Sequence, residues 1–208
     1  MAGPGRPDMS SAHLAIVLAA GGSQRLGRAK ALLTRDGETL VHRAARLALE
    51  SRPSRACVVV GAQADAVTDA VRDLPCRVVL NPDWREGMGG SLRRAGDAFA
   101  RAGVPVLVLA CDQPALALGH LQALLDGAAR ASSRCAATRH GDAIGIPAVV
   151  PGDWFSGPGR PSGDAGFARA LRELPTDARA VLDAPELLLD LDTADDVREA
   201  VSRGWLDR

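Results

Sequence analysis

The sequence predicts an α/β fold built on a mostly parallel, twisted sheet with helices on both faces. Short runs of apolar and β-branched residues alternate with longer segments whose apolar residues recur at helical spacing. The two strongest runs, residues 14–20 and 104–110, are apolar almost throughout, as expected of strands buried on both faces of a parallel sheet. Repeated strand–helix units of this kind favour parallel pairing through right-handed crossovers.

The first two thirds of the chain give a regular series of predicted elements. After the strand over 14–20, they are a helix over 40–51, a strand over 56–60, a helix over 64–74, a strand over 77–80, a helix over 90–102, the strand over 104–110 and a helix over 116–131. Each helix is long enough to cross back over the sheet between two parallel strands.

The last third of the chain is less regular. It predicts strands over 134–138 and 145–150 with a turn at Gly141, a Pro- and Gly-rich loop over 154–163, a helix over 164–174, a strand over 187–191 and a closing helix over 194–203. No composition break marks a linker, so we expect one domain over 13–208, with a lid-like or substrate-binding excursion at about 139–170. Residues 1–12, rich in Gly, Pro and Ser, are expected to be a disordered leader.

Composition excludes several classes of partner. The formal net charge is zero, which argues against a nucleic-acid or membrane surface. No apolar stretch approaches the roughly 20 residues of a membrane span. The run over 14–20 is only marginally long enough for the apolar region of a signal peptide, and cleavage after it would remove the glycine-containing loop that follows, so we do not expect a signal peptide. Four well-separated cysteines without C-x-x-C spacing predict reduced thiols and a cytoplasmic protein: Cys57, Cys76, Cys111 and Cys135.

The stretch after the first strand predicts a phosphate site. Two glycines, Gly21 and Gly22, let the backbone curl so that N–H groups converge on an anion, and Arg25 and Lys30 supply two cations. The P-loop pattern fails because Arg28 and the next residue replace its Lys and Ser/Thr. The dinucleotide fingerprint G-x-G-x-x-G fails as well. An ordinary strand-to-loop turn with surface charges is the alternative interpretation.

This stretch resembles the signature L-A-A-G-x-S-x-R-[ML]-G-x-x-K of the molybdenum cofactor cytidylyltransferase family, which has a MobA-like NTP transferase domain. The resemblance implies a Rossmann-like fold similar to that of the nucleotide-diphospho-sugar transferases. It also implies a nucleotide-binding loop made of Leu18, Ala19, Ala20, Gly21, Gly22, Ser23, Arg25, Gly27 and Lys30. Lys30 and Arg25 would be catalytic. Ala20 favours CTP, because guanylyltransferases of the family tend to have L-A-G-G there.

Two carboxylates are candidates for a metal site. Asp112 follows the strand over 104–110 and therefore lies at the same sheet edge as the glycine loop. Beside a triphosphate, one or two carboxylates typically hold Mg²⁺, and Asp112 resembles the family's catalytic metal ligand; Mn²⁺ is an alternative. Asp192 resembles a second ligand in the family's D-[IL]-D-T segment. Asp190, farther from the strand end, is expected to face away from the site. Helix capping is the alternative role for both ligands.

Three further residues are expected to border the nucleoside. Asn81 and Ser91 belong to a segment similar to the family's N-x-x-W-x-x-G-x-x-x-S, and Gly61 matches a turn near the base. A flexible loop with Ser91 as a helix cap is the alternative.

The acceptor half resembles the family less closely. Gln113 and Pro147 lie in C-D-Q-P and G-I-P-A segments, which favour molybdopterin as acceptor and imply a possible molybdoenzyme partner. Asp164 and Arg169 correspond to G-D-x-G-A-R, but Arg169 comes one position late, about 100° around a helix. Isoprenoid or sugar phosphates are alternative acceptors. A dehydrogenase-type or non-catalytic nucleotide-binding domain is the rival class. The missing G-x-G-x-x-G, and Gly61 where an acidic residue should end the second strand, argue against a dehydrogenase. The presence of Lys30 and Asp112 argues against a non-catalytic domain.

Overall fold

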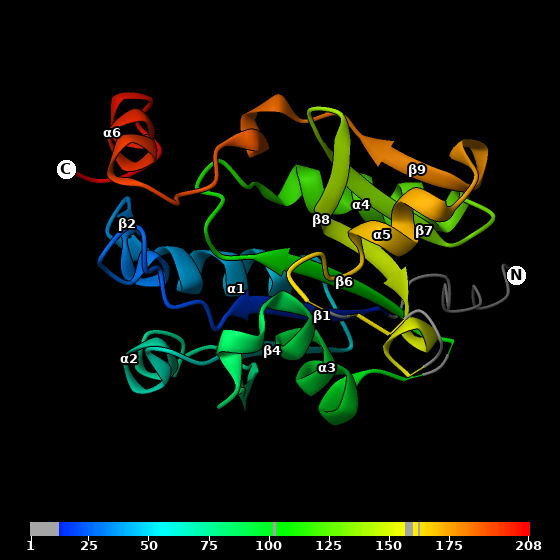
Figure 1. Ribbon diagram of the computed structural model, residues 1–208, viewed down its shortest axis with the longest axis horizontal. Coiled ribbons are helices and arrows are strands. Elements are labelled where there is room, and N and C mark those ends of the chain that lie inside the picture. Colours follow the sequence, from blue (N-terminus) through cyan, green and yellow to red (C-terminus); the bar gives the residue numbers. More distant parts are fainter. Residues whose placement is uncertain (1–12, 102, 157–159, 162) are drawn as a thin grey trace, which may run out of the picture.

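The protein is organised around one seven-stranded sheet with the strand order β5-β4-β1-β6-β8-β7-β9 (Figure 1). The computed structural model describes residues 13–101, 103–156, 160–161 and 163–208. The leader expected over 1–12 and part of the loop predicted over 154–163 lie outside the described residues.

Four parallel strands form one side of the sheet. They are β1 (Leu14–Ala19), β4 (Arg55–Val60), β5 (Arg77–Leu80) and β6 (Pro105–Ala110). All residues of β1 except Leu18 are buried, which explains its unbroken apolar sequence. The register pairs Ala19 with Val60 and Leu18 with Ala110. The carboxyl ends of these strands therefore meet at one edge, and the loops that follow them converge there.

The other side of the sheet is mixed. β8 (Ala143–Pro151) pairs antiparallel with both β6 and β7 (Cys135–His140), and β9 (Arg179–Leu182) pairs parallel with β7. The segment 139–170 therefore contributes a strand to the main sheet, rather than forming an excursion throughout. β9 has no counterpart in the sequence prediction, because its four residues are only partly buried and include one arginine.

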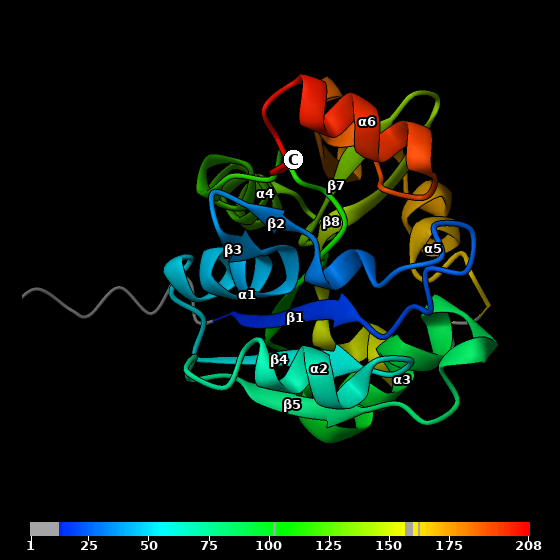
Figure 2. The same cartoon turned by 90° about the vertical axis from the view of Figure 1, so that its left-hand side faces the viewer.

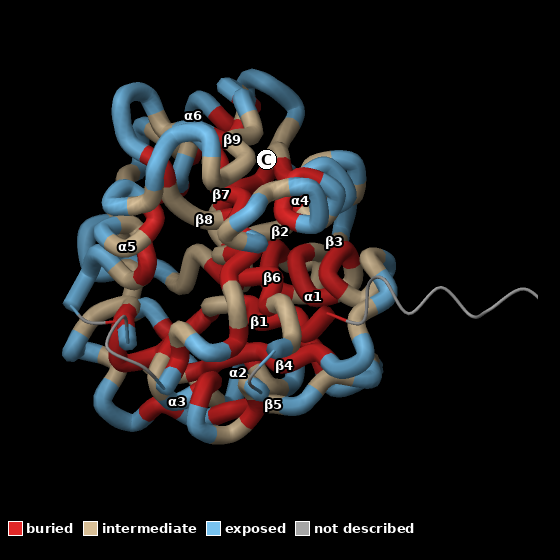
Figure 3. The backbone as a smooth tube through the Cα atoms, turned by 90° about the vertical axis from the view of Figure 1, so that its right-hand side faces the viewer, coloured by how far each residue is buried: buried red, intermediate tan, exposed pale blue. Residues whose placement is uncertain are grey.

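Helices cover both faces, as predicted. α1 (Leu40–Glu50), α2 (Ala64–Asp69) and α4 (Leu118–Arg130) pack on one face, where their apolar residues join Ala15, Val17 and Ala19 in one cluster. α3 (Met88–Phe99) and α5 (Ala168–Glu173) cover the other face and pack against Leu14 and Ile16. Figure 3 shows the buried tube running through β1, β4, β6 and α1. The alternation of β1 side chains between two apolar layers fixes the sheet at the centre of the molecule.

Short elements that periodicity does not predict complete the chain. They are the hairpin β2 (Thr34–Arg35) and β3 (Glu38–Thr39) and the 3₁₀ helices η1 (Lys30–Leu32), η2 (Trp84–Glu86), η3 (Gly152–Phe155), η4 (Thr176–Ala178) and η5 (Pro185–Leu188). The predicted helix over 164–174 begins only at Ala168, because Gly163 and Gly166 have positive φ angles of 56° and 51°.

The strand predicted over 187–191 is wrong. Pro185–Leu188 forms the 3₁₀ helix η5, which buries Leu187 and leaves Leu188 exposed. Leu191 then joins a small apolar cluster with Leu40 of α1 and with Val197 and Ala200 of the closing helix α6 (Ala194–Ser202). Thr193 caps α6 through a reciprocal capping box with Asp196. Figure 2 shows α6 and the C-terminus beside β2, where the Asp207 amide donates to the Thr34 carbonyl at 2.9 Å.

Within the part of the chain that the structure describes, no helix is both long and apolar enough to cross a membrane.

Candidate active site

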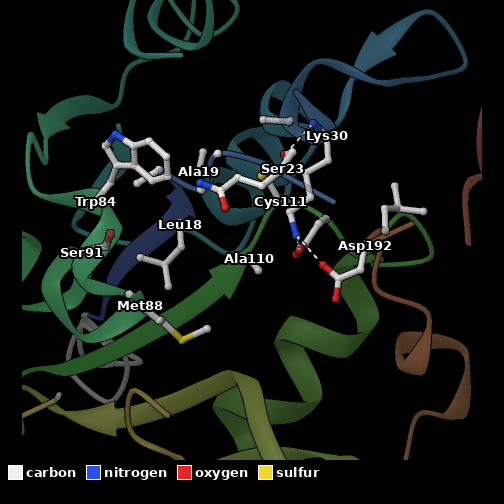
Figure 4. Close-up of a pocket in the computed structure, with 18 of the residues that line it drawn as sticks. Leu18, Ala19, Ser23, Lys30, Trp84, Met88, Ser91, Ala110, Cys111 and Asp192 are labelled. Carbon is white, nitrogen blue, oxygen red and sulfur yellow. Dashed lines mark hydrogen bonds and ion pairs between the residues drawn. The ribbon is translucent and has the colours of Figure 1, made fainter. Parts of the chain in front are cut away.

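A cavity of about 710 Å³ lies at the carboxyl ends of β1 and β6 (Figure 4). It brings together twelve of the residues predicted from sequence: Leu18, Ala19, Ala20, Gly21, Gly22, Ser23, Arg25, Lys30, Ser91, Asp112, Asp164 and Asp192. The six other predicted residues do not line it: Gly27, Gly61, Asn81, Gln113, Pro147 and Arg169. The predicted convergence of the glycine loop and Asp112 at one sheet edge is therefore what the structure shows.

The loop after β1 is closed by its own backbone. Ser23 has a φ of 49° and its carbonyl accepts hydrogen bonds from the amides of Leu26 and Gly27, at 3.1 and 3.0 Å. Gly27 has a φ of 71°, a conformation that glycine adopts without steric cost. The Ser23 hydroxyl then accepts from the Lys30 amide at 3.1 Å. These bonds fix the backbone of Lys30 at the far end of the loop, so that only its side chain has freedom.

Glycine is required at two positions beside this loop. A Cβ at Gly22 would lie 2.5 Å from the Trp84 ring, and a Cβ at Gly61 would lie 2.6 Å from the Ala20 carbonyl oxygen and 2.8 Å from the Trp84 Cβ. The indole therefore packs directly onto the loop. Trp84 also lines the cavity, on the side opposite Lys30 and Asp192 (Figure 4). Its place in the N-x-x-W segment was the available sequence signal, although the residue itself was not predicted as a site residue.

Asn81 and Ser91 act as a pair. Asn81 is buried and donates from Nδ2 to the Ser91 hydroxyl at 3.0 Å, while its Oδ1 accepts from the Asp83 amide. Only Ser91 lines the cavity. The alternative that Ser91 caps a helix is wrong, because α3 begins at Met88 and Ser91 lies inside its first turn. Asn81 thus orients the hydroxyl that faces the cavity.

Two cations and two carboxylates meet at the other end of the cavity. The Lys30 ammonium forms ion pairs with Asp112 and, at 3.3 Å, with Asp192. Arg25 pairs with the second Asp192 oxygen at 2.7 Å. The Lys30 and Asp112 side chains are only 20% and 15% exposed, whereas Arg25 is 70% exposed. Burial alone would lower the pKa of Lys30, but the Asp112 and Asp192 carboxylates outweigh it and raise that pKa, so Lys30 is charged.

Asp190 is a site residue that the sequence reasoning missed. The expectation that it faces away from the site is wrong, because residues two apart on a strand share a face and because this segment is not a strand. Burial and the nearby Asp112 carboxylate raise the pKa of Asp190 to about 7, partly offset by Lys30 and by a hydrogen bond from Gln113. A carboxyl group that titrates near neutrality beside charged groups is typical of functional sites.

A second cavity of about 620 Å³ adjoins the first and shares Met88, Ala110, Asp112 and Asp164 with it. Of the four residues predicted to bind an acceptor, Gln113 and Asp164 line this cavity, whereas Pro147 and Arg169 do not. Pro147 is buried in β8, and its carbonyl accepts from the Thr138 hydroxyl. Arg169 is 82% exposed and pairs with Glu173 one turn further along α5. Its late position turns it to solvent, so the structure places it outside this cavity.

The donor set suits a small divalent cation. Asp112 and Asp192 both reach the same ammonium, so they also lie close enough to share one metal ion. Among the described residues there is no cluster of three or more His, Cys, Asp or Glu side chains that could hold a metal alone. Two carboxylates plus phosphate oxygens is the arrangement that Mg²⁺ commonly uses. The residues therefore fit Mg²⁺ or Mn²⁺ bound together with a phosphorylated ligand.

A glycine loop, paired cations and carboxylates at the carboxyl edge of a mostly parallel sheet define a nucleotide-binding α/β protein of the nucleotidyltransferase class. Comparison with known families agrees with this class. The chain belongs to the MobA-like NTP transferase domain family, whose pattern matches residues 15–180.

Solved structures show the same fold. A protein of Mycobacterium tuberculosis H37Rv, Rv0371c, superposes with a TM-score of 0.76 at 26% identity, covering 93% of this chain and 100% of that one. A manganese complex of Rv0371c gives a TM-score of 0.72 at 25% identity, over 92% and 99% of the two chains. The fold is shared at lower identity by molybdopterin-guanine dinucleotide biosynthesis protein A of Archaeoglobus fulgidus, with a TM-score of 0.59 and 17% identity over 91% and 97% of the chains.

One curated relative carries a different activity in its name. Nicotine blue oxidoreductase from Paenarthrobacter nicotinovorans is 43% identical over 111 residues, which are 53% of this chain and 54% of that protein. The match thus spans about half the length of each protein.

Proposed function

We propose that the protein is a divalent-metal-dependent nucleotidyltransferase that transfers CMP from CTP to molybdopterin and releases pyrophosphate. The observation that carries the proposal is the meeting of Lys30, Asp112 and Asp192 at the end of a glycine loop. This arrangement offers amide donors and cations to a triphosphate and oxygen ligands to a metal. Family membership supports nucleotide chemistry, while CTP and molybdopterin are the proposal.

The reaction needs no general base among these residues. A phosphate monoester has a second pKa near 6 and is already ionised at neutral pH. Its oxygen attacks the α-phosphorus of CTP, a new P–O bond forms, and the bond to the departing pyrophosphate breaks. Lys30 and Arg25 stabilise negative charge on the phosphates, and the glycine loop positions them. Asp112 and Asp192 would hold Mg²⁺ or Mn²⁺, which neutralises phosphate charge when bound.

Three features support CTP as the donor and the second cavity as the acceptor site. Ala20 is buried, lines the cavity and takes the place of the glycine found in guanylyltransferases. Ser91, held by Asn81, offers a hydroxyl to the nucleoside. The second cavity adjoins the first and shares Asp112 and Asp164 with it, so an acceptor lying in it can present its phosphate at the α-phosphorus.

The test is a pyrophosphate-release screen of CTP, GTP, ATP and UTP, each with Mg²⁺ or Mn²⁺, against molybdopterin and against isoprenoid and sugar phosphates. The proposal predicts the highest rate with CTP and molybdopterin. Preference for GTP would refute the assignment of Ala20, and transfer only to a sugar or isoprenoid phosphate would refute molybdopterin as acceptor.

A second candidate function is reduction of a dye-like aromatic acceptor, and the curated relative favours it. A chain 43% identical to an oxidoreductase over half its length can share its chemistry, so this candidate is tested directly. We would follow oxidation of NADH and NADPH by absorbance in the presence of nicotine blue. Turnover there, without pyrophosphate release from any nucleotide, would favour the oxidoreductase.

We also propose that the protein acts in the cytoplasm and that a molybdoenzyme receives its product. All four cysteines are free thiols, and burial raises the pKa of both Cys57 and Cys111 to about 12, so these two are unreactive. Free thiols are typical of reducing compartments. Fractionation of cells and co-purification with molybdoenzymes test these two proposals.

A further inference from the structure

The metal-binding carboxylates have cations as partners within the protein itself. The Lys30 ammonium bridges Asp112 and Asp192, and Arg25 takes the remaining Asp192 oxygen at 2.7 Å. Two positive charges thus balance these two negative charges within one cluster. A metal ion that approached this cluster would meet neutralised carboxylates and a nearby ammonium, which repels it.

The side chain of Lys30 can leave this position without movement of the loop. Its backbone amide is held by the Ser23 hydroxyl, so the attachment point is fixed. Its side chain has four carbons and lines the same cavity as Gly21, Gly22 and Ser23, where a triphosphate would lie (Figure 4). An ammonium that swings toward a phosphate gains a new anionic partner and frees Asp112 and Asp192.

We propose that Lys30 is the resting counter-ion of Asp112 and Asp192, and that binding of a triphosphate draws its ammonium away and so opens the metal site. Metal binding then depends on phosphate binding, because the Lys30 ammonium exchanges the two carboxylates for the phosphate as its partner. The dependence is reciprocal, because any two linked binding events affect each other equally. The inference rests on the proposed metal role of Asp112 and Asp192, and it concerns the protein before nucleotide arrives.

The experiment measures Mn²⁺ binding to the nucleotide-free protein by electron paramagnetic resonance, which detects free Mn²⁺. Removing the ammonium in Lys30→Met leaves two carboxylates without their bridging cation. We expect Mn²⁺ to bind this variant at least tenfold more tightly than wild type, a difference of about 1.4 kcal/mol. Lys30→Arg, which keeps the charge, should retain the weak binding of wild type.

Two controls isolate the role of the ammonium. Arg28→Met removes the same charge from the same loop, but Arg28 is exposed and forms no ion pair among the described residues, so Mn²⁺ affinity should not change. The double variant Lys30→Met with Asp112→Asn should not show the tighter Mn²⁺ binding expected of Lys30→Met alone. Thermal unfolding with and without Mn²⁺ gives a second readout, in which Mn²⁺ should stabilise Lys30→Met more than wild type.

The outcomes separate the inference from the proposed function. Equal or weaker Mn²⁺ binding by a folded Lys30→Met variant overturns the counter-ion role. If wild type and variant bind Mn²⁺ equally tightly, the metal site stands and only the counter-ion role fails. If neither protein binds Mn²⁺ even after CTP is added, the metal assignment of Asp112 and Asp192 fails as well. None of these results depends on turnover of CTP.

Discussion

At the level of single residues, the site contains partly buried charged side chains, each of which is neutralised by an ion-pair partner. Asp112 is 15% exposed in its side chain, and Lys30 is its ion-pair partner. A partly buried ion pair of this kind is weak evidence for stability, since desolvation offsets much of its attraction. Its presence at the end of the glycine loop, in the proposed phosphate site, is therefore better explained by function.

We predict that Asp112→Asn lowers turnover at least a hundredfold while the protein stays folded, because one charge is lost with little change in volume. Pyrophosphate release across a Mg²⁺ titration, with thermal unfolding in parallel, makes the measurement. Asp126→Asn on the exposed face of α4 is the matched control and should behave as wild type. Near wild-type turnover by Asp112→Asn would remove this residue from the metal site.

Substitutions of Lys30 and Arg25 should affect different kinetic constants, kcat for Lys30 and KM for Arg25. In the proposed reaction Lys30 reaches the α-phosphate and contacts charge that develops as pyrophosphate leaves, so Lys30→Ala should lower kcat about 10²–10³-fold. Arg25 is exposed and pairs only with Asp192 among the described residues, so Arg25→Ala should chiefly raise the KM for CTP. Steady-state kinetics of both variants test this. A change confined to KM in Lys30→Ala would make Lys30 a binding residue only.

At the level of helices, strands and loops, close backbone approaches fix how the loops meet. Gly61 follows the last residue of β4, and its missing side chain lets the Ala20 carbonyl and Trp84 approach. The Ala62 amide donates to that carbonyl at 3.1 Å. This contact joins the end of β4 to the start of the nucleotide-binding loop. The turn after the second parallel strand therefore shapes the loop after the first.

Gly61→Ala should displace the nucleotide-binding loop, because its Cβ would lie 2.6 Å from a backbone oxygen that cannot move alone. We expect a several-fold weaker affinity for CTP by equilibrium dialysis and a lower melting temperature. Gly119→Ala on α4 is the control, since nothing lies within 4 Å of the position that its new methyl group would occupy. Gly119→Ala should leave the affinity for CTP unchanged, and its melting temperature should equal or exceed that of wild type. An unchanged affinity in Gly61→Ala would show that the loop tolerates the shift.

Helix α1 carries a pH-dependent contribution to stability. His42 lies between Glu38 and Asp73; burial opposes its charge, but hydrogen bonds to these carboxylates outweigh burial and raise the pKa of His42 above 6.5. A raised folded-state pKa means that the stabilisation is complete below 6.5 and is lost as pH rises through the folded-state value. The free energy of unfolding should therefore fall across that range in wild type.

His42→Gln should abolish this part of the pH dependence. Urea unfolding at a series of pH values from 5.5 to about 9, compared between wild type and variant, measures it. The neighbouring Glu38, whose pKa is lowered to about 2 by hydrogen bonds from Arg46 and His42 against the effect of burial, titrates well below this range. Parallel curves for the two proteins would contradict the role of His42.

At the level of the whole molecule, the C-terminal segment completes a site that begins near the N-terminus. Asp192 meets Arg25 across 167 positions and Lys30 across 162. What holds Asp192 there is its neighbour Leu191, which is fully buried with Leu40 and Val197. The small apolar cluster between α1 and α6 thus positions a charged residue that lines the candidate site.

Leu191→Ala should cost about 2–5 kcal/mol of unfolding free energy, the usual range for a buried leucine. It should also raise the metal concentration needed for activity, because Asp192 loses its anchor. Urea unfolding and a Mg²⁺ titration of turnover measure the two effects. Leu188 lies three positions before Leu191 and is 47% exposed. Leu188→Ala should therefore change the free energy of unfolding by about 0.5 kcal/mol or less. Equal stability of the two variants would show that the cluster does not anchor this segment.

Local sequence patterns were sufficient to predict the sheet, its helical layers and the glycine loop at the carboxyl end of β1. Strands β1 and β6 are apolar because both of their faces are covered, and that burial leaves a local, readable pattern. The carboxyl ends of parallel strands share an edge, so Lys30 and Asp112 could be placed in one site although they lie 82 positions apart. Signals of this kind depend on neighbours in the chain and on a general rule of topology.

The geometry of the carboxylates and the acceptor cavity depended instead on tertiary contacts. The segment before Asp192 has an apolar run that suits a strand or a turn, and burial of Leu187 in the core, where the segment contacts β7, selected the 3₁₀ helix, which leaves Asp190 in the second cavity. The late start of α5 turned Arg169 to solvent. The bridging of Asp112 and Asp192 by one ammonium follows from contacts across most of the chain. No local pattern encodes such contacts, because their energy comes from residues that meet only after folding.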